Sequence, residues 1–459
     1  MVGSLAARSE FDKSFVPHVR PYREIAVKLI FVNRYFFPDH SATSQLLSDL
    51  AFALAAAGQT VTVITSRQSY DDAKASLAPL EIVKGVRIVR IWTTRFGRSN
   101  LVGRAIDYLT FYLSAAWTMY RLARSGDVIV AKTDPPMLSV IAAPIARMRG
   151  AKLINWLQDL FPEVAQAIGV GTPSITAPVF RVMKIMRDGS LKAASANVVL
   201  GDLMAARVKS LGVAPKHIRI ISNWADGRLV SPLEPSHNPL RQDWELTDKF
   251  VVGYSGNLGR AHEYKTLLEA IEQLEKGPVA KPSNIERPCN SKAHSSATTA
   301  IPATPPIVWL FIGGGALYDA FQRETKARGL TSVVFKPYQP RERLSQSLSA
   351  ADVHLVSLRP DLEGLIVPSK FHGITAVGRP TLFIGDADGE IAQLVKRYDC
   401  GLTVPQGDGA ALAGAIRDLA RDPERRARLG TNARRAFEAA FDKPIAVTSW
   451  QSLLADVTR

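Results

Sequence analysis

Short apolar runs alternate along the chain with longer stretches in which apolar residues recur every three or four positions. Residues 41–58 have this helical period and end at Gly58. Short apolar runs alternating with helical stretches are typical of a parallel β-sheet covered by helices. In the first half, the runs that predict strands are residues 26–33, 60–66, 86–92, 127–133, 151–159 and 196–202.

The same alternation restarts after a seam at residues 221–232, where turn-forming residues cluster. The runs that predict strands there are residues 249–256, 307–314, 331–338, 351–358, 380–386 and 401–405. We therefore predict an α/β protein with two Rossmann-like, doubly wound domains that face a central cleft. Ligands of such sheets bind beyond the carboxyl ends of the strands, which places the expected site in that cleft.

The domain boundaries follow from this pattern. We expect a flexible N-terminal arm at 1–24, an N-terminal domain at 25–225, a C-terminal domain at 226–440, and a helix at 441–459 that returns toward the N-terminal domain. Residues 277–306 interrupt the second domain with a Pro-, Ser-, Thr- and Ala-rich sequence that has no apolar period. This composition predicts a disordered surface insertion, with a regulatory element as the alternative.

Composition agrees with a globular protein. The chain has 459 residues, too many for one ordinary core, with 46% hydrophobic and 22% charged residues. The chain has two cysteines, Cys289 and Cys400, which are too few for a stabilising set of disulfides in a chain of this size. We therefore expect reduced thiols and a cytoplasmic protein. The first residues lack the apolar run of a signal peptide.

The net charge of +15 is concentrated in the first half. Residues 1–225 hold 28 Lys and Arg against 15 Asp and Glu, whereas residues 226–459 hold 29 against 27. This asymmetry indicates contact with an anionic membrane surface or nucleic acid, or simply a solvated basic face. Residues 100–123 are apolar and aromatic, but Arg104 and Asp107 leave a clean stretch too short to span a bilayer. The segment is either a core helix or a helix in the membrane interface.

Two cationic helix starts in the second domain suggest an anion-binding site. Ser369 has the chemistry of a helix N-cap, yet Lys370 follows it, and a cation there costs about 0.3–1 kcal/mol unless an anion neutralises it. A glycine-rich strand exit with glycines 253, 256 and 259 precedes Arg260 and Lys265. Small residues, cations and a helix N-terminus form a phosphate cradle, and two such starts at one sheet edge suit a diphosphate.

These motifs resemble those of family 4 retaining glycosyltransferases of the GT-B fold. The resemblance runs from about residue 27 to 455 and includes "GYSGNLGR" with Lys265 five positions after Arg260, "WLQDLFPE", "ISNWADG", "FIGGG" and "PSKFHGITAVGRPTLFIG". Within the family the chain is most similar to bacterial enzymes of exopolysaccharide, O-antigen and colanic-acid synthesis. The resemblance implies a nucleotide diphosphate-sugar donor, a lipid-linked saccharide acceptor, no metal or other cofactor, and no nucleic-acid partner. It places the enzyme peripherally on the inner face of the cytoplasmic membrane.

The site residues are carried over from this resemblance. The catalytic set is Asp159, Glu363, Arg260 and Lys265. The donor-binding set is Ala42, Thr43, Gly256, Asn257, Gly259, Arg260, Lys265, Tyr338, Glu363, Gly364, Leu365, Ser369, Lys370 and Glu390. Asp159 could instead cap the turn that follows it.

The sequence departs from the family pattern at Gly373, where many relatives carry a second glutamate that helps to hold the ribose. Glu390 is a candidate to replace it, although a glutamate at a helix start is also an ordinary partner of the helix dipole.

Other chemistries fit less well. Asp386 and Asp388 have the spacing of a GT-A metal motif, but they lack a nearby third ligand and are interpreted as a turn. The glycines at 313–315 match the start of the dinucleotide-binding fingerprint, but Tyr318 occupies the position of its third glycine, which argues against an NAD enzyme. A sugar-nucleotide 2-epimerase of the same architecture and a non-catalytic basic membrane- or nucleic-acid-binding protein remain as alternatives.

Overall fold

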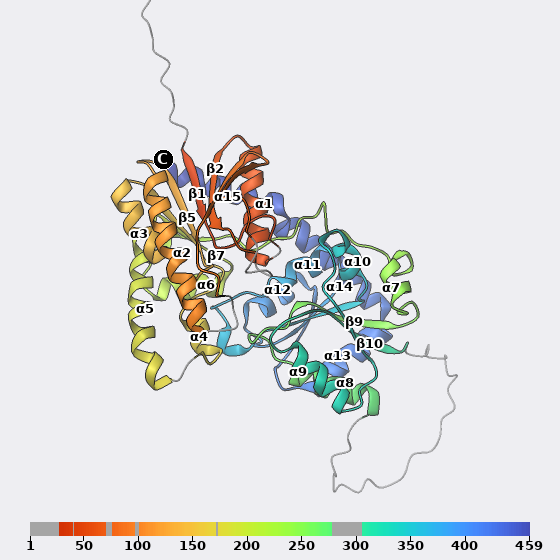
Figure 1. Ribbon diagram of the computed structural model, residues 1–459. Helices are drawn as coiled ribbons and strands as arrows, with labels where there is room; N and C mark the ends of the chain where they lie inside the picture. Colours follow the sequence, from red (N-terminus) through yellow and green to blue (C-terminus); the bar gives the residue numbers. More distant parts are fainter. Residues whose placement is uncertain (1–26, 40, 70–75, 97–100, 171–172, 278–304) are drawn as a thin grey trace, which may run out of the picture.

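The computed structural model describes residues 27–39, 41–69, 76–96, 101–170, 173–277 and 305–459. The predicted arm at 1–24 and nearly all of the predicted insertion at 277–306 lie outside these residues. The chain forms two α/β units, each built on a sheet of mainly parallel strands, which confirms the predicted fold class (Figure 1).

The first sheet has eight strands in the order β3-β4-β2-β1-β5-β6-β7-β8, and only β3 is antiparallel to its neighbour. Its strands are β1 Lys28–Val32, β2 Thr60–Ser66, β3 Leu80–Val83, β4 Val86–Ile91, β5 Val128–Lys132, β6 Lys152–Trp156, β7 Ala196–Val199 and β8 Ile218–Ile220. Its helices are α1 Ala42–Ala56, α2 Leu101–Leu122, α3 Leu138–Arg149, α4 Glu163–Ala167, α5 Pro173–Ala193 and α6 Asp202–Ser210. The apolar pattern missed the two edge strands β3 and β8, which are short and mostly exposed.

The second sheet has six parallel strands in the order β11-β10-β9-β12-β13-β14. Its strands are β9 Phe250–Asn257, β10 Ile307–Gly314, β11 Val333–Lys336, β12 Val353–Ser357, β13 Thr381–Ile384 and β14 Gly401–Val404. The helices of this half are α7 Pro239–Asp243, α8 Lys265–Lys276, α9 Tyr318–Ala327, α10 Leu344–Ser349, α11 Lys370–Ala376, α12 Glu390–Tyr398, α13 Gly409–Arg421 and α14 Pro423–Ala436. A π-helical turn, Phe437–Phe441, then leads into α15 Lys443–Thr458.

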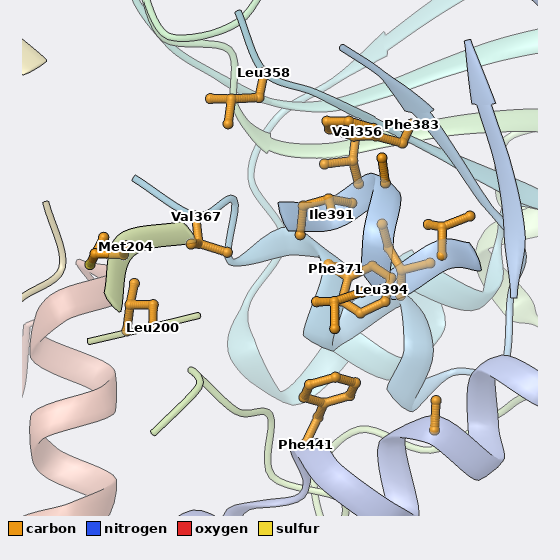
Figure 2. Close-up of a cluster of buried hydrophobic side chains, with 14 of the residues drawn as sticks. Leu200, Met204, Val356, Leu358, Val367, Phe371, Phe383, Ile391, Leu394 and Phe441 are labelled. Atoms are coloured by element: carbon orange, nitrogen blue, oxygen red, sulfur yellow. The ribbon is translucent and has the colours of Figure 1, made fainter. Parts of the chain in front are cut away.

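The two halves share a hydrophobic cluster at their junction. Figure 2 shows Leu200 and Met204 from the first half facing Val367 and Ile391 from the second. All four side chains are at most 9% exposed, so the contact excludes water as a domain core does.

Helix α15 lies in the core of the first domain. Trp450 is fully buried, and its ring centroid is 4.8 Å from that of Trp156 and 6.5 Å from that of Phe31. The chain crosses between the domains a second time just before α15, where Ala225 bridges Asp442 and Lys443 pairs with Asp226.

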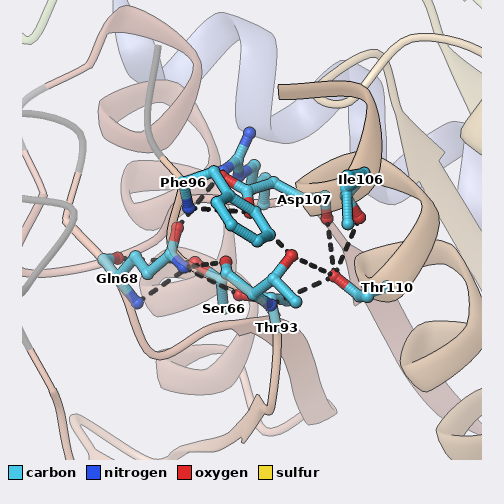
Figure 3. A network of polar contacts seen from close by, with 9 residues as sticks. Ser66, Gln68, Thr93, Phe96, Ile106, Asp107 and Thr110 are labelled. Carbon is cyan, nitrogen blue, oxygen red and sulfur yellow. Dashed lines mark hydrogen bonds and ion pairs between the residues drawn. The ribbon is translucent and has the colours of Figure 1, made fainter. Parts of the chain in front are cut away.

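Helix α2 is attached to the first sheet by a buried charged network. Asp107 is 0% exposed, lies 3.6 Å from the guanidinium of Arg34, and accepts hydrogen bonds from the Phe96 backbone and the Thr94 hydroxyl (Figure 3). Phe111 is also buried, so one face of α2 belongs to the core. The interpretation of residues 100–123 as either a core helix or an interfacial helix was therefore too simple, because the opposite face of α2 is exposed.

Candidate functional site

The glycine-rich exit of β9 lies at the carboxyl edge of the second sheet, between the ends of β10 and β12. Gly256 has a φ of +111° and Gly313, opposite it on β10, a φ of +138°. A Cβ on Gly313 would lie 2.3 Å from the Gly256 carbonyl oxygen, so the close approach of the two strand ends excludes any side chain there. The "FIGGG" motif thus lets the two backbones meet at the site.

Arg260 and Lys265 are exposed beyond this turn, and neither side chain makes an ion pair or hydrogen bond with another described residue. The backbone N–H groups at the start of α8 already have a hydrogen-bond acceptor within the chain. The carboxylate of Glu263 accepts hydrogen bonds from the backbone of Lys265 and Thr266 and from the Thr266 hydroxyl at 2.6 Å. The expectation that α8 offers its free backbone N–H groups to an anion is therefore wrong in its first turn, and only the two side chains are free to bind one.

Lys370 points away from its own helix, across to the end of β9. Its ammonium donates to the Asn257 carbonyl at 2.9 Å, lies 3.3 Å from Nε2 of His262, and sits 4.9 Å from the ring centre of Tyr254. Burial lowers the pKa of Lys370 to about 8. Burial, and then the charge of Lys370, lowers the pKa of His262 to about 3, so His262 is neutral and offers its Nε2 lone pair to the ammonium.

The lysine is thus held by neutral acceptors, and the expectation that it simply opposes its own helix dipole is wrong. His262 and Tyr254 were missed in the sequence, although both lie inside or beside the glycine–arginine–lysine motif.

Ser369 occupies the N-cap position of α11, but its exposed hydroxyl makes no capping hydrogen bond. Gly373, at the place of the family's second glutamate, faces α10. A Cβ there would be 3.2 Å from the Leu348 side chain, so a longer residue would displace that contact. The position therefore packs one helix on another.

Glu363 and Glu390 link the two domains through a pair of hydrogen bonds. Glu363 Oε2 accepts from the Glu390 backbone at 3.1 Å, and Glu390 Oε2 accepts from the Leu203 backbone, in the first turn of α6, at 2.9 Å. A ribose contact through Oε2 of Glu390 would have to break this interdomain bond.

Oε1 of Glu363 is buried without a hydrogen-bond partner. Burial raises the pKa of Glu363 to about 7, and the charges of Asp386 and Glu390 add to the shift.

Gly364 and Leu365 complete this loop. Gly364 is buried against the Leu203 backbone with a φ of +71°, whereas the Leu365 side chain lies in the apolar cluster between the domains. The Leu365 N–H donates to Leu362 and its carbonyl accepts from Leu160 at 2.9 Å. The assignment of Leu365 to donor binding therefore needs correction, because neither its side chain nor its backbone is free.

Asp159 lies on the opposite side of the same junction, where it forms a backbone bridge to Ile366. Burial, reinforced by the charge of Asp134, raises the pKa of Asp159 to about 7, and its Oδ1 has no hydrogen-bond partner. Asp159 and Glu363 thus place two carboxyl groups with raised pKa on the two sides of one interdomain loop contact. A cleft of about 430 Å³ opens beside Glu363, lined by α6 and by the loops after β12 and β13.

The remaining predicted residues flank the site. Ala42 and Thr43 begin α1, and the Thr43 carbonyl accepts from the buried Lys132 ammonium at 2.8 Å. Tyr338 is 60% exposed after β11, close to Gly314. The Asp388 N–H donates to Asp386 at 2.9 Å, as expected of a turn. Within the described part of the chain, no cluster of three or more metal-ligating side chains is found.

Both domains match known protein families. Residues 43–224 match the glycosyl transferase 4-like domain, and residues 237–436 match glycosyl transferases group 1. Each half of the chain is therefore similar to a glycosyltransferase domain family.

Two relatives extend this result. WbjE of Pseudomonas aeruginosa, described as a probable glycosyltransferase, is 26% identical over 71% of this chain and 74% of its own length. WcaI of Escherichia coli (strain K12), whose name places it in colanic acid biosynthesis as a glycosyl transferase, is 23% identical over 65% of this chain and 66% of its own.

Solved structures support the fold. A sucrose-phosphate synthase from Thermosynechococcus elongatus superposes with a TM-score of 0.71 at 19% identity, over 94% of this chain and 99% of that one. HepE of Anabaena, determined with UDP-glucose, superposes with a TM-score of 0.64 at 15% identity, over 94% and 99%. The two domains have the GT-B arrangement predicted from the sequence.

Proposed function

We propose that this chain is a retaining family 4 glycosyltransferase that moves a sugar from a nucleotide diphosphate-sugar to a hydroxyl of a lipid-linked saccharide during synthesis of a cell-surface polysaccharide. The observation that carries the proposal is the pair Arg260 and Lys265, two exposed cations without partners in the described structure at the carboxyl end of β9. The UDP-glucose complex of HepE supports the donor class, the names of both relatives support the transferase class, and the name of WcaI supports the pathway class.

The chemistry assigned to each residue follows from its position. Arg260, Lys265 and Lys370 stabilise negative charge on the departing diphosphate, an effect of about 3–4 kcal/mol for one well-placed donor in other enzymes. Asp159 and Glu363, with pKa values near 7, are partly protonated at neutral pH and so both donate and accept hydrogen bonds to sugar hydroxyls. The leaving phosphate takes the acceptor proton. No metal ion takes part in this scheme, so a chelator leaves turnover unchanged.

A membrane-facing surface supports the lipid-linked acceptor. Helices α2, α3 and α5 lie together on the outer side of the first domain, away from the second (Figure 1). Their exposed face carries large apolar side chains, among them Leu113, Trp117, Met148, Val182 and Ile185, each more than half exposed. We call this the α2–α3–α5 face.

Basic residues border the α2–α3–α5 face. Arg121 lies over the Trp117 ring and Arg149 over that of Tyr120, while Arg147 and Arg181 are exposed. Apolar side chains ringed by cations match the interface of an anionic membrane. None of the described helices is both long and apolar enough to cross a bilayer. We propose that the protein sits peripherally on the cytoplasmic leaflet.

One experiment tests the function. The full chain is incubated with a panel of nucleotide sugars and polyprenyl-diphosphate-linked saccharides, with and without chelator. The expected result is a free nucleoside diphosphate together with a lipid extended by one sugar in the donor's anomeric configuration. An isomerised nucleotide sugar would indicate a 2-epimerase, and the absence of turnover on the whole panel would indicate a binding protein.

A further inference from the structure

A carboxylate lies at the helix start between the two cations of the candidate donor site. Glu263 comes three residues after Arg260 and two before Lys265, the first residue of α8. Its side chain accepts from the backbone N–H groups of Lys265 and Thr266, and the Thr266 hydroxyl donates to it at 2.6 Å. A negative charge of the chain itself therefore takes the place that a phosphate could otherwise occupy at this helix start.

The chain holds this carboxylate from a second direction as well. Thr266 is 0% exposed, and its hydroxyl also accepts from the backbone N–H of Gly407, in the loop after β14, at 2.8 Å. Hydrogen bonds thus run from Glu263 through Thr266 to a neighbouring loop. If the Glu263 side chain swung out, the buried Thr266 hydroxyl and the first N–H groups of α8 would lose their acceptor, which costs free energy.

The charge of Glu263 matters more to an anion than to the fold. Serine, threonine and asparagine satisfy the N–H groups of a helix start without carrying a charge. A full negative charge at this position repels any phosphate that Arg260 and Lys265 attract. The hydrogen bonds of Glu263 go to backbone N–H groups and a hydroxyl, so it does not neutralise either cation by direct contact.

We propose that Glu263 sets the affinity of the donor site, because its carboxylate competes with the diphosphate for the start of α8. The nucleotide is then held by side chains alone and is released readily after transfer. This inference rests on the proposed function, since it takes the diphosphate to bind beside Arg260 and Lys265. A residue that only capped α8 would leave phosphate affinity unchanged.

Calorimetric titration of the full chain with UDP, inorganic pyrophosphate and uridine tests the competition. Glu263→Gln keeps an acceptor oxygen for the backbone and removes the charge, so UDP affinity should rise about three- to tenfold. Pyrophosphate should gain at least as much, and uridine, which has no phosphate, should gain nothing. The gain for UDP should shrink as salt rises. Glu269→Gln, an exposed glutamate further along the same helix, is the matched control.

Urea unfolding of the same proteins reports the capping role separately. Glu263→Ala removes both the acceptor and the charge, so its unfolding midpoint should fall, and that of Glu263→Gln should fall less. Both variants should nevertheless bind UDP more tightly than the wild type. Stability and affinity therefore move in opposite directions, which the loss of a purely structural cap would not produce.

The outcomes separate this inference from the proposed function. It is overturned if Glu263→Gln binds UDP no more tightly than the wild type, or if uridine gains as much as UDP. If neither UDP nor pyrophosphate binds to the wild type or to either variant, the diphosphate site itself is wrong and the inference is wrong with it. Binding that appears only in the variants would support the competition. UDP binding without sugar transfer would count against the proposed function alone, because the comparison of affinities needs no turnover.

Discussion

The Lys370 ammonium lies 3.3 Å from Nε2 of His262, whose other ring nitrogen is 2.6 Å from the Ser357 carbonyl oxygen. The histidine therefore donates through Nδ1 to the backbone and accepts from the lysine through Nε2. A helix-start cation is thus held at the end of β9 by neutral groups alone, ready for an anion that arrives beside Arg260.

We expect Lys370→Met to lower both stability and nucleotide affinity. The substitution leaves His262 Nε2 without a donor and the Asn257 carbonyl with the Tyr254 hydroxyl alone, which should cost about 1–3 kcal/mol of unfolding free energy. UDP affinity should fall at least tenfold, because a cation beside the diphosphate is lost. Urea unfolding and calorimetry measure the two effects, with the exposed Lys326→Met as control. A more stable variant with unchanged UDP affinity would show that Lys370 has no role in anion binding.

The pKa of Lys370, about 8, predicts a pH dependence of nucleotide binding. Below that value the side chain is charged and attracts a diphosphate, and above it the charge is lost. UDP affinity should therefore fall as the pH rises through about 8. Titrations from about pH 7 to pH 9.5 should show the decline in the wild type and a flatter curve in Lys370→Met. Parallel curves would assign the titration to another group.

We predict that Arg260→Ala or Lys265→Ala each cuts turnover at least tenfold, since a single electrostatic donor in an active site is often worth more than that. Neither side chain has a partner in the described structure, so the unfolding transition should not move. Lys326→Ala, a third exposed cation of the same domain, should leave turnover unchanged. Full activity in both variants would remove the diphosphate assignment.

The two carboxyls at the domain junction predict how stability varies with pH. The folded protein holds the protons of Asp159 and Glu363 up to about pH 7, well above the range for an unfolded chain. Because the folded state binds more protons in that window, raising the pH through it lowers the free energy of unfolding. We expect Asp159→Asn to remove this loss and gain on the order of 1–3 kcal/mol over the wild type at about pH 8.

At about pH 4 the same variant should gain little, because the wild-type carboxyl is then protonated in both states. Glu363→Gln should shift stability in the same direction, and Asp388→Asn, an exposed carboxyl nearby, is the control. A pH-independent effect of Asp159→Asn would mean that packing, not protonation, sets its contribution.

The α2–α3–α5 face predicts binding to anionic vesicles that weakens as salt rises, because the attraction of the basic border decays over about a Debye length. Trp117→Ser and Ile185→Ser should each reduce vesicle sedimentation about tenfold without unfolding the domain. Phe111→Ser should instead destabilise the protein by several kcal/mol, since its ring is fully buried. A protein that stays in solution with acidic vesicles at low salt would leave this face without a membrane role.

The buried strands of both sheets were predictable because they are short, uniformly apolar runs separated by helical periods, whereas the exposed edge strands β3 and β8 were not. Phe111 and Trp117 show the limit of that signal, since both belong to one apolar helix and yet one is buried and the other exposed. The spacing of Arg260 and Lys265 after a strand pointed to two exposed cations beyond a strand exit, and their role in donor binding stays a prediction. The contacts of Glu390 with Leu203 and of Leu365 with Leu160 were not predictable, because they join residues far apart in sequence whose meeting depends on how the two domains dock.

Helix α15 has a consequence for how the molecule is made. Phe31 and Trp156 belong to the first domain to leave the ribosome, but Trp450, whose ring packs against both, is translated only after the whole second domain. During synthesis the apolar surface of the first domain that α15 later covers therefore stays exposed until α15 is made, and such exposure favours aggregation or chaperone binding. A fragment that stops before Lys443 should express poorly on its own, and α15 supplied as a separate peptide should restore its solubility.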